Sequence, residues 1–201
     1  MTREIKYIEV EKILKILDVV HNHRDRLMIK LFFATFCRCN ELRNIRISDI
    51  KFNRDLIHIR ADTTKTKVER MVVIPKQLKD EIIRLLKKEK RHDTLSTDYL
   101  FKSREGQLTN RRIRQLFQEY SVKAEIQEVY NTSKDGRKLF AVTPHTLRHS
   151  GIIEALNKGI PQTVIMEQSG HKSLQSFQIY SKFSVRDRQR IFKEKNYYEL
   201  I

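Results

Sequence analysis

Hydrophobic positions recur with a helical period over most of the chain. Residues 10–20 place apolar side chains three and four positions apart, which is the pattern of an amphipathic helix. A more apolar run predicts a second, largely buried helix from about residue 24 to residue 39. Thr109 and Thr143 suit helix N-caps, and Pro144 suits the first helical position. Further helices are therefore predicted over residues 78–90, 109–124, 143–159 and 161–168.

A pattern typical of strands interrupts the helices between residues 47 and 74. Short runs rich in β-branched residues cover 47–52, 56–60 and 70–74. A turn-forming triplet at 53–55 separates the first two runs, and a polar stretch at 61–69 separates the second from the third. We expect one mainly α-helical domain with a small three-stranded antiparallel β-sheet. Residues 131–138 are expected to form a loop.

The charge of the chain indicates which class of partner it binds. Its 201 residues include 41 Lys and Arg against 25 Asp and Glu, which gives a formal net charge of +16. Basic side chains gain free energy by releasing counterions from nucleic-acid phosphates. The excess therefore predicts a polyanionic partner, with a well-solvated basic surface as the alternative.

The sequence offers no membrane or metal signature. The longest strongly apolar stretch, residues 31–37, is too short to span a bilayer, and charged residues interrupt the N-terminal region. Cys37 and Cys39 are the only cysteines, and no further ligands at zinc spacing accompany them. We expect a cytoplasmic protein with free thiols, and with neither a metal nor a small-molecule cofactor.

The helix expected to begin at Thr143 brings two candidate phosphate ligands to one face. His145 and Arg148 lie three residues apart, near the positive end of the helix dipole. Arg148 can clamp phosphate oxygens with two donors, while His145 can donate to the same phosphate or accept a proton. The alternative is a buried pair that satisfies backbone carbonyls.

Arg38 and Glu41 occupy the expected second helix and its end. An unpaired charge in so apolar a stretch would be costly, so Arg38 requires an anionic partner. An ordinary ion pair with Glu41 meets that need. A second phosphate ligand, oriented by Glu41, meets it equally well.

A lysine, a histidine and a tyrosine complete the set of candidates. Lys65 lies at the tip of the expected hairpin and can act as a proton donor if its pKa falls toward neutrality, although Lys67 is an equally basic neighbour. His171 follows Gly170 in a turn and can bind a phosphate oxygen. Tyr180 can act as a nucleophile in a strong positive field. A solvated lysine, a surface histidine and a core tyrosine are the alternatives.

These residues, in this order, resemble the catalytic domain of the tyrosine recombinase (phage integrase) family. The resemblance covers about residues 5–184 and is strongest in His145-Thr146-Leu147-Arg148-His149-Ser150, Gly170-His171 and Tyr180. The 23 residues from Arg148 to His171 and the nine from there to Tyr180 agree with the usual spacing.

Two further motifs support the resemblance, and two positions depart from it. Arg38 with Glu41 matches the family's first-arginine motif, and Lys65 within Thr-Lys-Thr matches its hairpin lysine. Phe36 stands where the family usually has glycine, and Ser169 stands where it usually has leucine.

The resemblance implies a mechanism for cutting and rejoining DNA. Tyr180 would attack the scissile phosphate, leaving a 3′-phosphotyrosyl link and a free 5′ hydroxyl, with Lys65 as general acid. The residues that would stabilise the pentacoordinate phosphate are Arg38, Arg148, His145 and His171, with His145 also a candidate base. Glu41 and His149 would support them. A type IB topoisomerase and a DNA-binding module without turnover are the alternatives.

The resemblance also implies an organisation and partners. Residues 1–184 would form the catalytic domain and residues 185–201 a C-terminal helix or tail that can dock on another protomer. The N-terminal core-binding domain usual in the family is expected to be absent. Double-stranded DNA is the expected partner of a chain that is monomeric in solution and tetrameric on DNA. Further DNA contacts are assigned to Lys67, Arg111, Arg112 and Arg114.

Overall fold

The computed structural model describes residues 7–180, except residues 92, 94, 104, 105, 134 and 137 and the side chain of Tyr130. Two units are distinguished: the larger ends at Gly170 and the smaller begins at His171. The tail expected at residues 185–201 lies outside the described residues.

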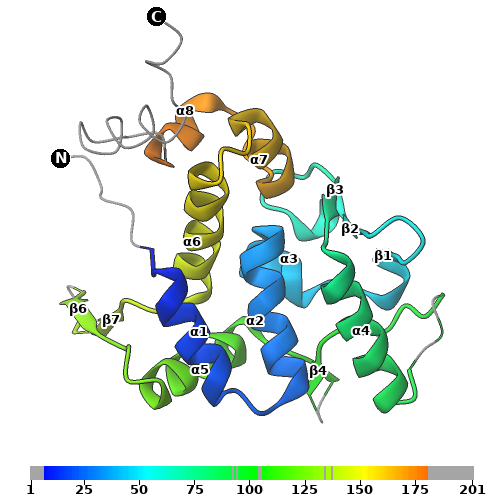
Figure 1. Cartoon of the computed structure of the whole chain (residues 1–201), viewed down its shortest axis with the longest axis horizontal. Helices are drawn as coiled ribbons and strands as arrows, with labels where there is room; N and C mark the ends of the chain where they lie inside the picture. The colour runs from blue at the N-terminus through cyan, green and yellow to red at the C-terminus, as the bar shows by residue number, and fades with distance from the viewer. Residues whose placement is uncertain are drawn as a thin grey trace, which may run out of the picture. The chain divides into compact units, whose positions relative to one another are not determined.

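The helical period of the sequence produces most of the larger unit (Figure 1). Thr109 and Thr143 cap two of its helices as predicted, because each side-chain oxygen accepts a hydrogen bond from the backbone N–H three residues later. The helices are α1 (Val10–Val19), α2 (His23–Thr35), α3 (Cys39–Arg43), α4 (Lys76–Lys88), α5 (Asn110–Lys123), α6 (Pro144–Asn157) and α7 (Gln162–Ser169). None of the helices in the described part of the chain has the length and apolar character needed to cross a membrane.

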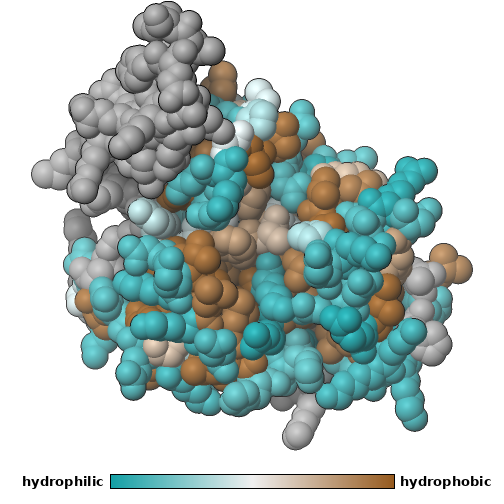
Figure 2. Space-filling model, in the orientation of Figure 1, coloured by the Kyte–Doolittle hydropathy of each residue, from teal (hydrophilic) through white to brown (hydrophobic). Residues whose placement is uncertain are grey.

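Helix α2 forms the centre of the hydrophobic core. It packs against α6 and α4, and the ring of its Phe32 meets Phe117 of α5 edge to face at a centroid distance of 5.5 Å. Charged residues are largely excluded from this core, so they gather on the surface. Polar residues cover most of the coloured part of the face in Figure 2, and apolar residues form separate patches between them.

The prediction of one helix from residue 24 to residue 39 is wrong at its C-terminal end. Helix α2 ends at Thr35, because Phe36 adopts the left-handed conformation with a φ of 53°. The chain then restarts as the short helix α3, with Arg38 at its N-cap. Arg38 therefore lies at a helix start, where its side chain can leave the core.

The predicted three-stranded sheet is confirmed, with a shorter first strand. Strands β1 (Ile50–Lys51), β2 (Leu56–Ile59) and β3 (Arg70–Val73) pair antiparallel in the order β1-β2-β3. Residues Ile47–Asp49, predicted as strand, form the 3₁₀ turn η1 instead, because the Asp49 carboxylate accepts the backbone N–H of Arg46 at 2.8 Å. A second 3₁₀ turn, η2 (Ala61–Thr63), begins the segment that joins β2 to β3.

Two additional hairpins were not predicted from the sequence. Strands β4 (Lys102–Ser103) and β5 (Gly106–Gln107) form one of them. Strands β6 (Val129–Thr132) and β7 (Lys138–Phe140) form the other, so the expected loop at 131–138 is wrong at both ends. Only the turn between these strands matches the polar, loop-like composition of that segment.

The smaller unit is described from His171 to Tyr180. Helix α8 (Leu174–Phe177) begins at Ser173, whose side chain accepts the N–H of Ser176, and the 3₁₀ turn η3 (Gln178–Tyr180) follows it. The predicted turn that contains His171 thus leads into a short helical segment that ends at Tyr180.

Candidate active site

Arg38 donates two hydrogen bonds to the carboxylate of Glu41 at the start of α3. The backbone N–H of Arg38 donates to Glu41 Oε2 at 2.8 Å, and its guanidinium donates to Glu41 Oε1 at 3.0 Å. The Glu41 side chain is 1% exposed, whereas 28% of the Arg38 side chain remains exposed. Burial acts to raise the pKa of Glu41, but hydrogen bonds from Arg70 and Arg38 bring it below its usual value. Glu41 is therefore an ionised, buried carboxylate.

Arg148 is held inside the domain by backbone carbonyls. Its side chain is 1% exposed; its guanidinium donates to the carbonyl of Phe36 and, at 2.9 Å, to that of Ser169. A purely structural arginine would make the same two hydrogen bonds. They join α6 to the break after α2 and to the end of α7.

Gly151 allows α6 to approach α2 closely enough for these contacts. A Cβ at this position would collide with the carbonyl oxygen of Phe33 and would lie 2.9 Å from the ring of Phe36. The ring of Phe36 thus fills space that a side chain at residue 151 would need. The carbonyl of Phe36 is brought within reach of Arg148 by the same packing.

His145 lies in the first turn of α6, as the sequence predicts, and it is exposed whereas Pro144, Thr146 and Leu147 of the same turn are buried. Its ring lies 4.3 Å from that of His149, measured between centroids. Partial burial lowers the pKa of His145, and the charges of Arg148 and Arg38 lower it further. Both arginines are thus close enough to act on the imidazole, which is neutral at neutral pH.

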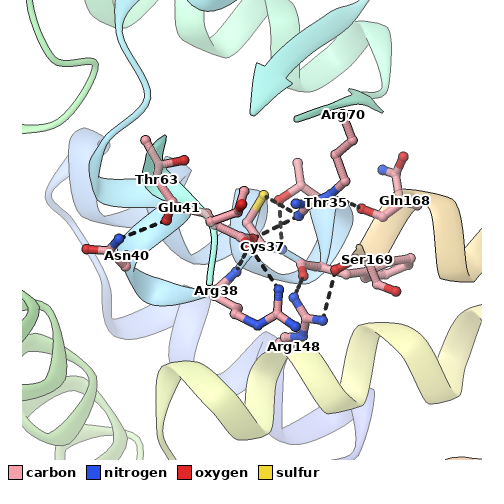
Figure 3. A network of polar contacts seen from close by, with 12 residues as sticks. Thr35, Cys37, Arg38, Asn40, Glu41, Thr63, Arg70, Arg148, Gln168 and Ser169 are labelled. Carbon is pink, nitrogen blue, oxygen red and sulfur yellow. Dashed lines mark hydrogen bonds and ion pairs between the residues drawn. The ribbon is translucent and has the colours of Figure 1, made fainter. Parts of the chain in front are cut away.

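A third arginine, not identified from the sequence, joins this group (Figure 3). Arg70, at the start of β3, donates to Glu41 Oε2 at 2.8 Å and to the carbonyl of Gln168 at 3.0 Å. A period-two strand pattern places Arg70 on the same face as Val72, which is fully buried. An arginine on the core face of a strand requires a buried anion, and that signal could have revealed it.

Lys65 lies in an exposed turn whose backbone is anchored from α3. The side-chain amide of Asn40 donates to the carbonyl of Thr63 at 2.8 Å, and the hydroxyl of Thr64 accepts the N–H of Val68 at 3.2 Å. Lys67, in the same turn, is exposed and has a φ of 53°. The segment that carries Arg38 therefore also fixes the base of the lysine turn.

His171 and Tyr180 come together in the smaller unit. Their ring centroids lie 5.7 Å apart, and the ring of Phe177 packs against both, at 5.3 Å from His171 and 5.1 Å from Tyr180. The sequence spacing that singled out these two residues thus corresponds to a real proximity.

A pocket of about 410 Å³ adjoins Arg38 and His145. Arg114 of α5 and Lys138 of β7 also line it, so three cations and the neutral imidazole of His145 surround one hollow. Arg111 and Arg112 are exposed on the same helix as Arg114, and Arg112 pairs with Glu119 at 2.7 Å. The expected DNA-contacting residues are thus all on the surface.

The thiol beneath this cluster is not reactive. Cys37 is fully buried, and burial raises its pKa to about 11, although the charge of Arg70 opposes that rise. Both cysteines are free. Within the described residues, no group of three or more His, Cys, Asp or Glu side chains is placed to hold a metal ion.

Comparison with protein families identifies one match. The model described as "Phage integrase family" matches residues 4–186 of the chain.

Named relatives agree with this match. Tyrosine recombinase XerA of Thermococcus kodakarensis is 33% identical over 92% of this chain and 58% of its own length. Tyrosine recombinase XerC of Chlamydia trachomatis is 29% identical over 92% of this chain and 54% of its own. The chain thus spans about three fifths of the length of the relatives it matches. Neither name favours a topoisomerase or a DNA-binding module without turnover.

Solved structures share the fold. The crystal structure of XerA recombinase covers 96% of this chain and 64% of its own, with a TM-score of 0.76 and 22% identity. XerH site-specific recombinase bound to difH substrate covers 95% of this chain and 55% of its own, with a TM-score of 0.72 and 21% identity. At these identities the likeness establishes the fold, which is that of a tyrosine recombinase catalytic domain.

Proposed function

The chain belongs to the phage integrase family, and from that premise we propose that it cuts and rejoins DNA as the catalytic part of a site-specific recombinase. The observation that carries the proposal is the convergence of Arg38, Arg148 and His145 in the larger unit. Each comes from a position that matches the family's motif, and the two arginines act together on the pKa of the histidine.

In the proposed reaction, the hydroxyl oxygen of Tyr180 attacks the scissile phosphorus and displaces the 5′ oxygen of the next nucleotide. The phenolic proton passes to His145, and Lys65 protonates the departing oxygen. The product is a 3′-phosphotyrosyl link and a free 5′ hydroxyl. Attack by a 5′ hydroxyl from a partner strand reverses each step, and the covalent link conserves the energy of the broken bond.

The cations have a separate role. Negative charge develops on the non-bridging oxygens as the phosphorus becomes pentacoordinate, and fixed cations stabilise it most where they are already oriented. We assign this stabilisation to Arg38, Arg148 and His171, with Glu41 and His149 in support. His171 lies near Tyr180 in the smaller unit, which suits a group that binds the phosphate beside the nucleophile.

The partners and the setting follow from the same proposal. Double-stranded DNA is the substrate, and the protein acts on it as a tetramer of chains that are monomeric when free. The cytoplasm is the proposed place of action. Lys67, Arg111, Arg112 and Arg114 contact the DNA backbone around the reacting phosphate.

A suicide-substrate experiment tests the proposal. The protein is incubated at low salt with a pool of nicked duplexes that carry randomised inverted repeats. The nick lies a few nucleotides beyond the cleavage position, so that the released fragment diffuses away and rejoining fails. We expect a covalent protein–DNA adduct that survives denaturation, maps to Tyr180 by mass spectrometry, and captures a restricted set of sequences.

The matched control is Tyr180→Phe, which removes only the nucleophilic oxygen. It should bind the captured DNA as wild type does and form no adduct. Failure of the wild type to form an adduct with any member of the pool would refute the proposal. An adduct that persists in Tyr180→Phe would refute the assignment of the nucleophile, and adducts without sequence preference would favour a topoisomerase.

A further inference from the structure

Arg70 lies where three segments of the candidate site meet. Its Nε donates to the carbonyl of Gln168 at 3.0 Å, and its Nη2 donates to Glu41 Oε2 at 2.8 Å and contacts the Sγ of Cys37 at 3.8 Å. Its side chain is 11% exposed, against 28% for Arg38. Arg70 is thus occupied by protein atoms, whereas Arg38 retains a surface that a ligand can reach.

The carboxylate of Glu41 couples these two arginines. Oε1 accepts from the guanidinium of Arg38, and Oε2 accepts from Arg70 and from the backbone of Arg38. A carboxylate held at both oxygens has one orientation, so the guanidinium of Arg38 has one as well. Removing Arg70 would leave Oε2 with a single donor and would free Glu41 to turn.

The C-terminal turn of α7 couples Arg70 to Arg148. Gln168 and Ser169 are the last two residues of this helix, where carbonyl groups lack partners within the helix. Arg70 binds the first of these carbonyls, and Arg148 binds the second at 2.9 Å. Two cations therefore satisfy the negative end of α7 side by side.

Gly170 gives Arg70 room to reach this position. A Cβ on residue 170 would lie 2.9 Å from Nη1 of Arg70, and the residue has a φ of 73°. Any side chain there would push the guanidinium away from the end of α7. The glycine that precedes His171 is thus needed for two reasons, its left-handed backbone and the space that Arg70 occupies.

We propose that Arg70 is a positioning residue for the phosphate-binding arginines, acting on Arg38 through Glu41 and on Arg148 through the end of α7. This role rests on the proposed function, because it assumes that Arg38 and Arg148 bind the scissile phosphate. Arg70 does not touch the phosphate. Among Arg38, Arg70, Arg148 and Glu41, positive charge exceeds negative by two, which suits an oxyanion that gains charge during the reaction.

The electrostatics are consistent with a permanent charge at this position. Burial acts to lower the pKa of Arg70, but the hydrogen bond and charge of Glu41 raise it above its usual value. Arg70→Lys would keep that charge but lose the planar fork that reaches two acceptors at once. It is therefore the variant that tests positioning separately from charge.

The kinetic test uses the full chain and the duplex captured in the suicide-substrate experiment. Arg70→Lys should slow single-turnover cleavage by about a hundred-fold, because a misplacement of about 1 Å costs that much in a preorganised site. Its dissociation constant for DNA should change by less than about threefold, since the number of phosphate contacts is unchanged. Wild-type cleavage by a folded Arg70→Lys would overturn the proposal.

The matched control is Arg60→Lys. Arg60 follows β2 in the same sheet, is 20% exposed, and bonds Asp49 and the carbonyl of Asn44. The free energy of unfolding of Arg60→Lys should fall by about as much as that of Arg70→Lys, yet Arg60→Lys should cleave DNA at close to the wild-type rate. Equal slowing in both variants would mean that the sheet, not Arg70, matters, and the proposal would fall.

A double variant tests the route through Glu41. Contacting residues in one network give non-additive effects. Arg70→Lys combined with Glu41→Gln should therefore be no more than about threefold slower than the slower single variant. Rates that multiply would show that the two residues act independently. If Arg70→Lys does not fold, Glu41→Asp, which keeps every charge but shortens the link, should slow cleavage similarly, and a wild-type rate would overturn the proposal.

A spectroscopic measurement separates this proposal from the proposed function. In the free protein, the Nε–H resonance of Arg38 should be observable by ¹⁵N NMR and should broaden or shift in Arg70→Lys but not in Arg60→Lys. This measurement needs no DNA, so it reports on Arg70 even if the wild type forms no adduct. An unchanged Arg38 resonance in Arg70→Lys would overturn the positioning role.

Discussion

At the scale of single residues, His145 is the group on whose protonation state the proposed reaction depends most. The sequence left two roles open for it, phosphate donor and proton acceptor. Partial burial and the charges of Arg148 and Arg38 lower its pKa, so the free protein holds it neutral at neutral pH. A neutral imidazole beside a phosphate can take the proton of an attacking phenol, which favours the base.

The pH dependence of His145 can be measured directly. The NMR titration midpoint of its ring in the DNA-free protein should lie below the ordinary value of 6.5, and Arg38→Gln should raise it by removing one of the lowering charges. Because the pKa of His145 is lower in the folded protein than in the unfolded chain, the unfolded chain binds more protons below pH 6.5. His145 therefore reduces the free energy of unfolding as the pH falls below 6.5. A midpoint at or above 6.5 in the wild type would contradict the assignment.

Some candidate site residues could be located from the sequence because their signal is local. His145 and Arg148 share a helical face through their spacing, and Thr143 fixes where that helix begins. For Arg70, the strand pattern indicates a buried position that needs an anion, but it does not indicate the partners, which lie 29 and 98 residues away in the chain. Its role depends on a sheet and a helix end meeting, which no short window of sequence reveals.

At the scale of elements, α7 is tied to the free edge of the sheet. The side-chain amide of Gln168 accepts the N–H of Val73 at 2.9 Å and donates to its carbonyl at 2.8 Å, as a neighbouring strand would. Strand β3 is an edge strand, and such edges leave backbone groups unpaired. One side chain thus covers part of that edge and positions the helix that leads to His171.

Substitutions at Gln168 should separate the two hydrogen bonds that its side chain makes with Val73. Gln168→Met should speed hydrogen exchange at the Val73 amide and reduce stability by about 1 kcal/mol, whereas Gln168→Glu should be similarly less stable but keep that amide protected. Exchange rates and urea unfolding would measure both effects. Gln162→Met is the control, because the side chain of Gln162 contacts only Met166 of the same helix in the described bonds. Equal hydrogen exchange at the Val73 amide in all three variants would refute the hydrogen bond between Gln168 and Val73.

Element boundaries were the part of the fold that the sequence concealed. Position 36 of the apolar run through residue 39 holds phenylalanine, so neither a glycine nor a proline there indicates that the backbone turns left-handed. The hairpin of β6 and β7 is polar enough to resemble a loop, and its strands exist because they pair with each other. The period of the hydrophobic positions predicts where the helices lie, but tertiary contacts determine where the helices end.

At the scale of the whole molecule, the excess of positive charge favours a polyanionic partner, and the number of phosphate contacts would set how the binding responds to salt. A net charge of +16 favours any polyanion, and six to ten phosphate contacts would lower DNA affinity by about a thousand-fold or more between 50 and 200 mM salt. The question is which side chains make those contacts. Helix α5 presents Arg111, Arg112 and Arg114 at its exposed start.

The three arginines of α5 should contribute unequally. Arg111→Gln and Arg114→Gln should each reduce the slope of log affinity against log salt by about one, as expected for a lost phosphate contact. Arg112→Gln should reduce it less, because Arg112 already pairs with Glu119. Fluorescence anisotropy at several salt concentrations would measure the slopes. Unchanged slopes in all three variants would show that this face of α5 does not meet DNA.

The contacts of Arg148 have a consequence for how the protein folds during its synthesis. Its guanidinium binds the carbonyl of Phe36, 112 residues earlier, and that of Ser169, 21 residues later. A growing polypeptide on the ribosome possesses Arg38, Glu41 and Arg70 long before Arg148 or the end of α7 has been translated. The candidate site therefore closes only when nearly the whole described chain is available, so under the proposed function an unfinished polypeptide would be unable to cleave DNA.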